Sequence, residues 1–288
     1  MKIIKDVEMK DYTSFKAGGK ANKMVICERE DEVIETLREI REKNEKYIML
    51  GNGSNTLVKD SGFSGTVIKL GDSFSKIIRT GNNLVCGGNT LMSVVAKYAL
   101  REGLTGFEFA SGIPGSIGGA FFMNAGAYGG EIKDIAKSAK IVSHDTLELK
   151  EVGLSDMGLS YRHSAFQENG DIILSVEISL EEGNKSEIES TMKDLAKKRN
   201  SKQPVQFPSA GSFFKRPEGH FAGKLIQDSG MKGVSVGGAQ VSELHGGFIV
   251  NKGNATATDI IQLMELVLKK VYEKFGVSLE PEVRIIGD

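Results

Sequence analysis

Two glycine-rich stretches have the residue types and spacing of anion-binding loops. The longer one, Ser111 to Gly130, has the sequence SGIPGSIGGAFFMNAGAYGG and carries almost no charge. Interior glycines cost a helix about 1 kcal/mol each, and apolar residues such as Ile113 and Phe121 favour burial over a solvated linker. Because glycine lets backbone amides come close to a phosphate, the stretch could hold a pyrophosphate. The alternative is a tight bend in a buried sheet, where glycine marks crowded backbone.

The shorter stretch, GNGSN at Gly51 to Asn55, directly follows the strand-like run YIML. Ser54, Asn55 and Thr56 add hydroxyl and amide donors to its glycines, as a phosphate-binding loop requires. The motif is not a P-loop, because no Lys-Ser or Lys-Thr follows its second glycine. It is not a dinucleotide fingerprint either, because Thr56 stands where a third glycine is needed. A nucleotide cofactor would therefore bind on a fold other than the Rossmann fold.

The composition argues against several other kinds of site. The four histidines and two cysteines show no metal-ligand spacing, so we expect no metal centre. A formal net charge of −1 gives no electrostatic reason to expect nucleic acid or an acidic membrane as partner. The first residues, MKIIKDVEMKDY, contain no apolar signal region, and no run approaches the length of a membrane span. We expect a cytoplasmic protein, and nothing in the sequence demands more than a monomer.

Helices and strands of moderate length must position these loops. The apolar spacing predicts amphipathic helices over 31–44, 90–102 and 258–275, with Thr90 capping the second and Gly276 ending the third. A charged helix is expected over 183–200 and a helix-like piece over 220–233. Strands are expected over 47–50, 66–70, 76–80, 84–88, 140–144, 146–152, 172–180, 246–251 and 277–287.

Seven motifs together resemble the family of UDP-N-acetylenolpyruvoylglucosamine reductases, flavoenzymes of peptidoglycan synthesis. The motifs are TSFKAGG, GNGSN, GIPGSIGGAFFMNAGAYG, YRHSAF, AGSFFKRP, GGFIVN and LEPEVRIIG, and they occur in the family's order and at about its separations. The resemblance runs nearly end to end and favours the anion-site interpretation of both glycine stretches. The chain is short between Gly130 and Ser160, which is similar to the compact, type II subgroup. Closure over substrate would then depend on movement of the C-terminal domain.

The resemblance implies an α+β protein with three domains. Residues 1–70 and 71–200 would form a two-subdomain FAD-binding fold of the vanillyl-alcohol oxidase (PCMH) type, whose common region is about 19–183. The C-terminal strand, 279–288, would pack back on the first subdomain. Residues 201–288 would form an α+β substrate-binding domain.

The resemblance also implies non-covalent FAD, with NADPH as co-substrate. Backbone dipoles of the two stretches, without a lysine, would hold the FAD pyrophosphate. The expected cofactor-binding residues are Gly51, Asn52, Gly53, Ser54, Asn55, Thr56, Gly112, Ile113, Pro114, Gly115, Ser116, Gly118, Gly119 and Asn124.

The implied reaction reduces UDP-N-acetylglucosamine enolpyruvate to UDP-N-acetylmuramate. A hydride from flavin N5 reaches the vinyl carbon, charge builds on the adjacent carbon and carboxylate, and that carbon takes a proton. Arg162 in YRHSAF matches the family's catalytic arginine, Ser212 in AGSFFKRP its proton donor, and Glu282 in LEPEVRIIG its third catalytic position. Without the resemblance, a surface arginine and a turn serine would be the plainer interpretations. Glu280, beside the same proline, matches no role.

Substrate contacts are expected at Tyr128, Lys215, Arg216, Lys232 and His245. Tyr128 would face the diphosphate or sugar, and Lys215, Lys232 and His245 lie where the family's substrate domain offers polar groups to the UDP portion. Arg216 departs from the pattern, because many relatives have asparagine there. It could pair with a phosphate or point to solvent.

Two other functions share part of this pattern. An FAD-dependent oxidase of the same cofactor fold would need the glycine stretches but not AGSFFKRP or LEPEVRIIG at these places. A non-catalytic module that senses a nucleotide or cell-wall precursor would have no need of Arg162, Ser212 and Glu282 together.

Overall fold

The structure is a computed structural model and describes all residues from 1 to 288. The chain forms two compact units, each made of segments that are separate in sequence. The first unit comprises Met1–Ile4, Lys23–Asn52 and Gly65–Arg199. The second comprises Lys5–Asn22, Gly53–Ser64 and Asn200–Asp288. The expected three-domain division stays a prediction.

A four-stranded sheet near the N-terminus has the order β1-β2-β5-β3. Its strands are β1 (Lys2–Glu8), β2 (Lys20–Cys27), β5 (Phe63–Leu70) and β3 (Tyr47–Met49). Helix α1 (Glu30–Glu42) buries the face that carries Val33, Leu37 and Ile40 against this sheet. The periodicity over 31–44 therefore predicted this helix to within two residues at its C-terminal end.

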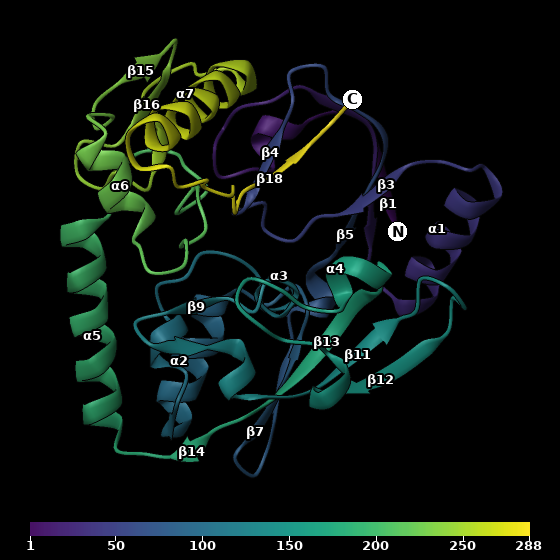
Figure 1. Ribbon diagram of the computed structural model, residues 1–288. Coiled ribbons are helices and arrows are strands. Elements are labelled where there is room, and N and C mark those ends of the chain that lie inside the picture. The colour runs from purple at the N-terminus through teal and green to yellow at the C-terminus, as the bar shows by residue number, and fades with distance from the viewer. The chain divides into compact units, whose positions relative to one another are not determined.

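A five-stranded antiparallel sheet is the centre of the first unit (Figure 1). Its order is β12-β11-β13-β7-β6, from Leu149–Gly153, Ala136–Val142, Ile172–Ser179, Asn83–Gly87 and Ile77–Thr80. Helices α2 (Met92–Glu102) and α3 (Ile117–Phe122) add apolar side chains, including Val95 and Phe121, to the core of this unit. The second glycine stretch thus begins outside the core and enters it at α3.

The start of α2 differs from the expectation. Thr90 does not cap this helix, because the N-cap is Leu91, which makes no side-chain capping bond. The Thr90 carbonyl instead accepts a hydrogen bond from the Ile117 amide at 2.8 Å, and its hydroxyl is buried without a protein partner. Pairing with the glycine stretch therefore overrides the local capping preference of threonine.

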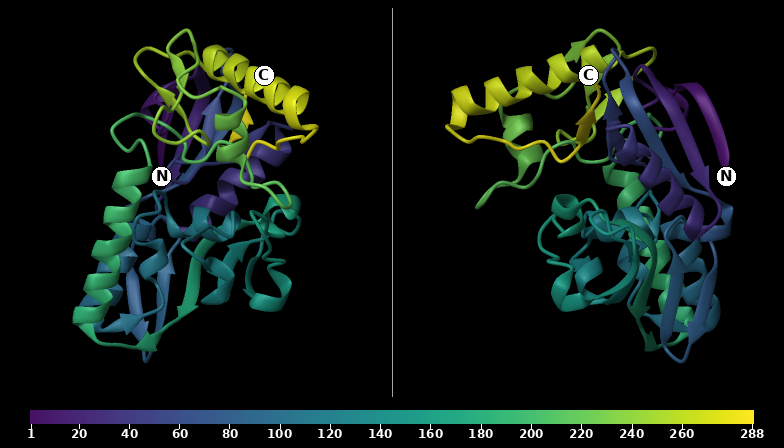
Figure 2. Two further views of the ribbon diagram at one scale, coloured as in Figure 1. Left: turned by 60° about the vertical axis from the view of Figure 1, so that its left-hand side comes forward. Right: turned by 90° about the vertical axis from the view of Figure 1, so that its right-hand side faces the viewer.

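The second unit is built around α7 (Ala257–Phe275), one uninterrupted helix in both views of Figure 2. Thr256 and Asp259 form a capping box at its start, and Gly276 ends it with φ +66°. The helix packs with α6 (Ala222–Asp228) and a three-stranded sheet of order β15-β16-β17. These strands span Ser235–Val236, Ala239–Val241 and Ile249–Asn251.

The C-terminal strand joins this unit to an early segment of the chain. Strand β18 (Arg284–Ile286) pairs in parallel with β4 (Thr56–Val58), and the two lie side by side in Figure 1. Residues 284–286 thus pair with residues 56–58, and the packing of 279–288 on a first subdomain stays a prediction. The strand is shorter than the run 277–287, because residues before Arg284 pair with a different segment.

The remaining elements are short, apart from one helix. Helix α5 (Lys185–Lys202) is largely exposed and α4 (Phe166–Asn169) is a single turn. Two-stranded ribbons form from β8 (Leu104–Thr105) with β14 (Glu181–Glu182), and from β9 (Gly126–Ala127) with β10 (Gly130–Glu131). Turns of 3-10 helix occupy Met9–Asp11, Asp72–Phe74, Glu108–Ala110, Ile132–Asp134 and Leu154–Asp156. None of the helices has both the length and the apolar character to cross a membrane.

Candidate active site

The loop Gly51–Asn55 presents a row of backbone donors. The amides of Gly51, Asn52, Gly53 and Asn55 donate no hydrogen bond within the protein. Gly53 has φ +63°, and a Cβ at this position would lie 2.0 Å from the Tyr12 carbonyl oxygen. The loop therefore requires glycine here for both its conformation and its close contact. Open amides in such a turn suit the oxygens of a diphosphate.

The Asn55 side chain bonds to another segment of the protein. The Asn55 side-chain amide donates to the Glu282 carbonyl at 3.1 Å, and the Arg284 amide donates to the Asn55 carbonyl at 3.0 Å. Thr56 begins β4. Asn55 thus fixes the loop to the C-terminal segment, and its own cofactor contact would use the backbone.

The stretch GIPGSIGG offers donors at its beginning only. The amides of Gly112, Gly115 and Ser116 donate no hydrogen bond within the protein. The Gly118 amide donates to the Gly88 carbonyl at 3.0 Å, and that of Gly119 to the Ser116 hydroxyl at 3.4 Å. For Gly118 the crowding interpretation holds, because a Cβ would lie 2.9 Å from the Gly88 oxygen.

The two stretches meet within the first unit. A Cβ on Gly51 would lie 2.6 Å from the Ser116 hydroxyl, so the first loop passes directly over the start of the second. The open amides of Gly51 and Ser116 therefore lie close enough to serve one ligand. Donors without a carboxylate among them fit an anionic group such as the FAD diphosphate. Contacts of Ile113 and Pro114 with the cofactor stay predictions.

Asn124 is fully buried and holds two segments together. Its side-chain amide donates to Glu131 at 2.7 Å and to the Ser160 carbonyl at 2.8 Å, and its oxygen accepts the Lys133 amide at 2.9 Å. These bonds occupy both of its donors. Its geometry favours positioning the turn that carries Arg162 over direct contact with a cofactor.

Arg162 and Tyr128 occupy backbone conformations that side chains rarely adopt. Their φ values are +55° and +54°, and Asn124 has +40°. Such residues cluster at functional sites, since the surrounding structure must hold them there. Arg162 donates to the Gly126 carbonyl at 3.4 Å, next to the ribbon β9–β10 whose tip is Tyr128. The structure therefore bonds the predicted catalytic arginine to the ribbon that carries the predicted substrate tyrosine.

Ser212 and Glu282 lie on one strip of the second unit. The Glu282 amide donates to the carbonyl of Phe213 at 2.8 Å, and Phe214 bridges Pro281 in antiparallel fashion. Ser212 is exposed and follows Gly211, whose φ is +77°. Since the Asn55 side chain bonds the Glu282 carbonyl, the strip connects Asn55 to Glu282 and to the segment that carries Ser212. Arg162 belongs to the first unit.

Among the expected substrate residues, Lys215 pairs with Glu280. Its Nζ lies 2.5 Å from the Glu280 carboxylate, which is 69% exposed. Glu280, which matched no role in the sequence, therefore orients a predicted substrate lysine. Arg216 stacks its guanidinium 4.0 Å over Phe221 and donates to the His220 carbonyl at 3.2 Å. It holds its own loop, and a phosphate contact stays a prediction.

Lys232 and His245 are neighbours. Burial and the nearby Lys232 ammonium lower the pKa of His245, although a backbone hydrogen bond opposes them. The neutral imidazole accepts the Gly247 amide at Nδ1 over 3.1 Å, which leaves Nε2 as a donor. This arrangement suits a polar group of a substrate.

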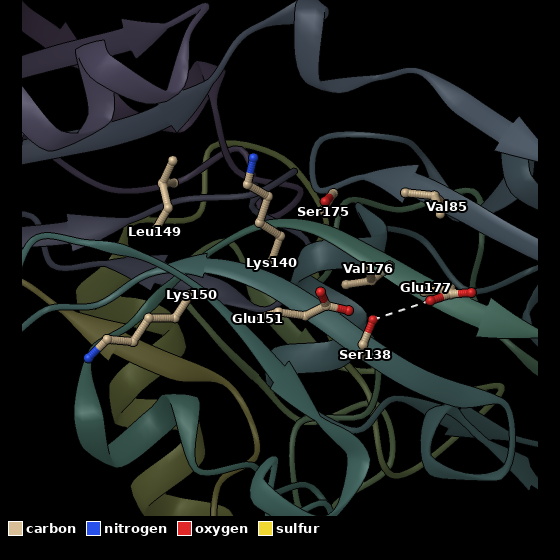
Figure 3. Close-up of a pocket in the computed structure, with 9 residues that line it drawn as sticks. All are labelled: Val85, Ser138, Lys140, Leu149, Lys150, Glu151, Ser175, Val176 and Glu177. Carbon is tan, nitrogen blue, oxygen red and sulfur yellow. Dashed lines mark hydrogen bonds between the residues drawn. The ribbon is translucent and has the colours of Figure 1, made fainter.

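A hollow of 340 Å³ elsewhere in the first unit is not part of this site (Figure 3). It lies on the polar face of the five-stranded sheet and contains none of the predicted residues. Lys140 in it pairs with Glu30 at 2.6 Å, and Glu177 accepts hydrogen bonds from Asn83 and Lys137. Charged and polar side chains of this kind are typical of a solvated sheet face.

Two cations near the glycine stretches were missed in the sequence. Lys69 donates to the Gly51 carbonyl, and burial lowers its pKa to about 8. A Cβ on Gly112 would lie 3.1 Å from the Arg199 side chain, whose pKa burial also lowers. A lysine in the otherwise apolar run TVIKL was the available signal for Lys69. Arg199 sits in a charged helix, where nothing distinguishes it.

Comparisons with known proteins agree with this geometry. Residues 203–286 match the family model of the C-terminal domain of UDP-N-acetylenolpyruvoylglucosamine reductase, and residues 21–149 match an FAD binding domain. A UDP-N-acetylenolpyruvoylglucosamine reductase of Alkaliphilus oremlandii is 51% identical over 286 residues, which cover 99% of this chain and 94% of the relative. One from Clostridium botulinum is 48% identical, with 99% and 93% covered.

A crystal structure gives the same result. UDP-N-acetylenolpyruvylglucosamine reductase from Thermus caldophilus superposes with a TM-score of 0.84 at 34% identity and covers 99% of this chain and 98% of its own. These matches favour a reductase over the oxidase alternative. The chain belongs to the UDP-N-acetylenolpyruvoylglucosamine reductase family.

Proposed function

We propose that the protein is an FAD-dependent reductase that uses NADPH to convert UDP-N-acetylglucosamine enolpyruvate into UDP-N-acetylmuramate. The observation that carries the proposal is the strip of hydrogen bonds that connects Asn55 to Glu282 and Glu282 to Phe213, beside Ser212. In a chain of this family, that strip supports Ser212 as the proton donor and Glu282 as the carboxyl group of the reaction. Both cysteines are free and buried, which agrees with a cytoplasmic setting.

The open amides of Gly51, Asn52, Gly115 and Ser116 would hold the FAD diphosphate. When bound, FAD supplies the two electrons and the hydride taken from NADPH. The protein residues manage the charge and the proton that the reaction requires. We expect a monomer, and a measurement of the molecular mass in solution tests this expectation.

Arg162 would stabilise the substrate carboxylate as the adjacent carbon gains negative charge. Its rigid guanidinium suits a carboxylate with enolate character, and the strained backbone fixes its direction. Ser212 would give its hydroxyl proton to that carbon, which yields the lactyl ether. Glu282 would replace the proton on Ser212 or bind near the substrate carboxylate in its protonated form.

Ser212→Ala tests the proposal by separating the two half-reactions. We expect NADPH to bleach the flavin absorption of this variant nearly as in the wild type. Its recovery on addition of enolpyruvyl substrate, without oxygen, should slow by about 10²-fold or more, because one proton donor is worth that much. Ser209→Ala, in the same segment, is the matched control and should behave as the wild type.

Three outcomes would count against the proposal. Equal slowing of both half-reactions in Ser212→Ala would indicate a structural serine. Wild-type protein that holds no flavin, even after refolding with FAD, would leave the binding module as the better interpretation. Flavin that bleaches but recovers only with oxygen would favour the oxidase.

A further inference from the structure

Lys69 on β5 directs its ammonium group at the backbone of the loop Gly51–Asn55. Its Nζ donates a hydrogen bond to the Gly51 carbonyl oxygen. The neighbouring side chains of Ile68 and Leu70 belong to the apolar cluster around α1. Because successive side chains of a strand point to opposite faces, Lys69 projects from the other face of β5, toward the loop.

No acidic side chain compensates the charge of Lys69. Burial alone lowers the pKa of its amine to about 8. The titratable groups of the adjacent strands are engaged elsewhere, since Tyr47 on β3 bonds His144 at 2.7 Å and Lys23 on β2 pairs with Glu45 at 3.2 Å. A buried cation without a counter-ion is stabilised by any anion that binds nearby.

The peptide group between Gly51 and Asn52 links Lys69 to the open side of the loop. A trans peptide is planar, so its carbonyl and its N–H point in opposite directions. With the Gly51 oxygen held by Lys69, the Asn52 N–H points away from Lys69. Asn52 is exposed, and this amide has no acceptor in the protein. Positive charge at the oxygen also polarises the peptide and strengthens its N–H as a donor.

We propose that Lys69 is a positioning residue for FAD, whose ammonium group fixes the Gly51–Asn52 peptide so that the Asn52 amide is presented to the diphosphate. The inference rests on the proposed FAD site. It goes beyond that site by adding a cation to a loop that otherwise offers only neutral dipoles.

Protonation of Lys69 is then linked to FAD binding. A bound diphosphate favours the charged amine, so its pKa is higher in the complex than in the free protein. Below about pH 7 the amine is protonated in both states and the affinity is constant. As pH rises through 8, the free protein loses a proton that the complex keeps. The affinity for FAD then falls by up to about tenfold per pH unit, and binding takes up a proton.

The test measures the dissociation constant of FAD from the holoenzyme, by the rise in flavin fluorescence on dilution, between pH 6.5 and about 9.5. At pH 6.5 we expect Lys69→Met to weaken FAD binding by about ten- to hundredfold, because a hydrogen bond to a charged group contributes about this much. The deprotonated wild type resembles the variant, so the two curves should converge at the high end. Lys43→Met is the control, because it removes one exposed lysine of the same unit.

The outcomes separate this inference from the proposed function. Wild-type protein that binds no FAD would overturn both. Wild-type protein whose affinity does not change with pH, or a Lys69→Met curve parallel to the wild-type curve, would overturn the role of Lys69 alone. If Lys69→Met does not fold, calorimetry of the wild type in buffers of different ionisation enthalpy decides, because the proposal requires proton uptake near pH 8.5.

Discussion

Gly53→Ala should damage the cofactor loop far more than its φ angle alone would require. Gly276→Ala provides the comparison, because both glycines lie in the second unit and have nearly equal φ, +63° and +66°. An alanine in this region costs about 1–2 kcal/mol. At Gly276 a Cβ meets no atom within 4 Å, so that cost is the whole expected effect.

At Gly53 a Cβ would also lie 2.0 Å from the Tyr12 carbonyl oxygen and 3.0 Å from the Thr13 Cα. The Tyr12 segment cannot simply retreat, because the Ser14 amide is bonded to the Gly53 carbonyl at 3.0 Å. Overpacking of this kind costs about 1–3 kcal/mol more. We therefore expect the free energy of unfolding to fall by about 2–5 kcal/mol in Gly53→Ala and by about 1–2 kcal/mol in Gly276→Ala.

Urea unfolding of the flavin-free proteins measures the difference in stability, and flavin release from the holoenzymes measures the difference in FAD affinity. Removing flavin matters, since a ligand that binds only the folded state adds its own stability. The FAD dissociation constant should rise at least about tenfold in Gly53→Ala, because a shifted loop misdirects its amides. It should stay unchanged in Gly276→Ala. Equal losses of stability and wild-type FAD affinity in both variants would refute the close-contact argument.

Four further variants follow from the same geometry. Glu282→Gln should slow flavin reoxidation by substrate and spare flavin reduction by NADPH. Glu280→Gln should change only the substrate concentration for half-maximal rate, by a few fold, because the exposed pair of Glu280 with Lys215 is worth at most about 1 kcal/mol. Equal slowing of reoxidation by both variants in stopped-flow assays would contradict this distinction. Asn124→Ala should lower the free energy of unfolding by about 2–4 kcal/mol, measured in denaturant, because three buried hydrogen bonds lose their partner. Asp60 accepts bonds from the first turn of α7, and although burial opposes them, they hold its pKa below the ordinary value. The ionised Asp60 carboxylate therefore contributes to the free energy of unfolding above about pH 4, and this contribution is lost as pH falls further. Asp60→Asn should flatten that part of the pH–stability curve. An unchanged curve would exclude the linkage between protonation of Asp60 and stability.

Local patterns were enough to predict the longer amphipathic helices. The spacing of Ile260, Met264 and Val271 predicted α7 to within one residue, and Gly276 ends it as expected. Helix α1 was predicted from the same kind of pattern. These signals succeed because an amphipathic helix and its caps depend on residues within a few positions of one another.

Long-range pairing could not be predicted from the chain alone. The bond from Asn55 to Glu282 and the pairing of β4 with β18 join residues more than 220 positions apart. Thr90 fails as a cap for the same reason, since it pairs with a segment far from α2 in sequence. The resemblance to a family gave Ser212 and Glu282 their roles, but only the structure shows which backbone bonds connect them.

The glycines of the two stretches look equivalent in the sequence and differ in the structure. The Gly118 amide is hydrogen-bonded and the position has no room for a side chain, so crowding explains the glycine there. Gly115 leaves its amide open, and Gly53 combines an open amide with a close contact. Crowding and amide presentation both require the absence of a Cβ, so a glycine pattern cannot distinguish them. The hydrogen bonds of each amide can, and they leave donors open in the first loop and at the start of the second stretch, where Lys69 and Arg199 also lie.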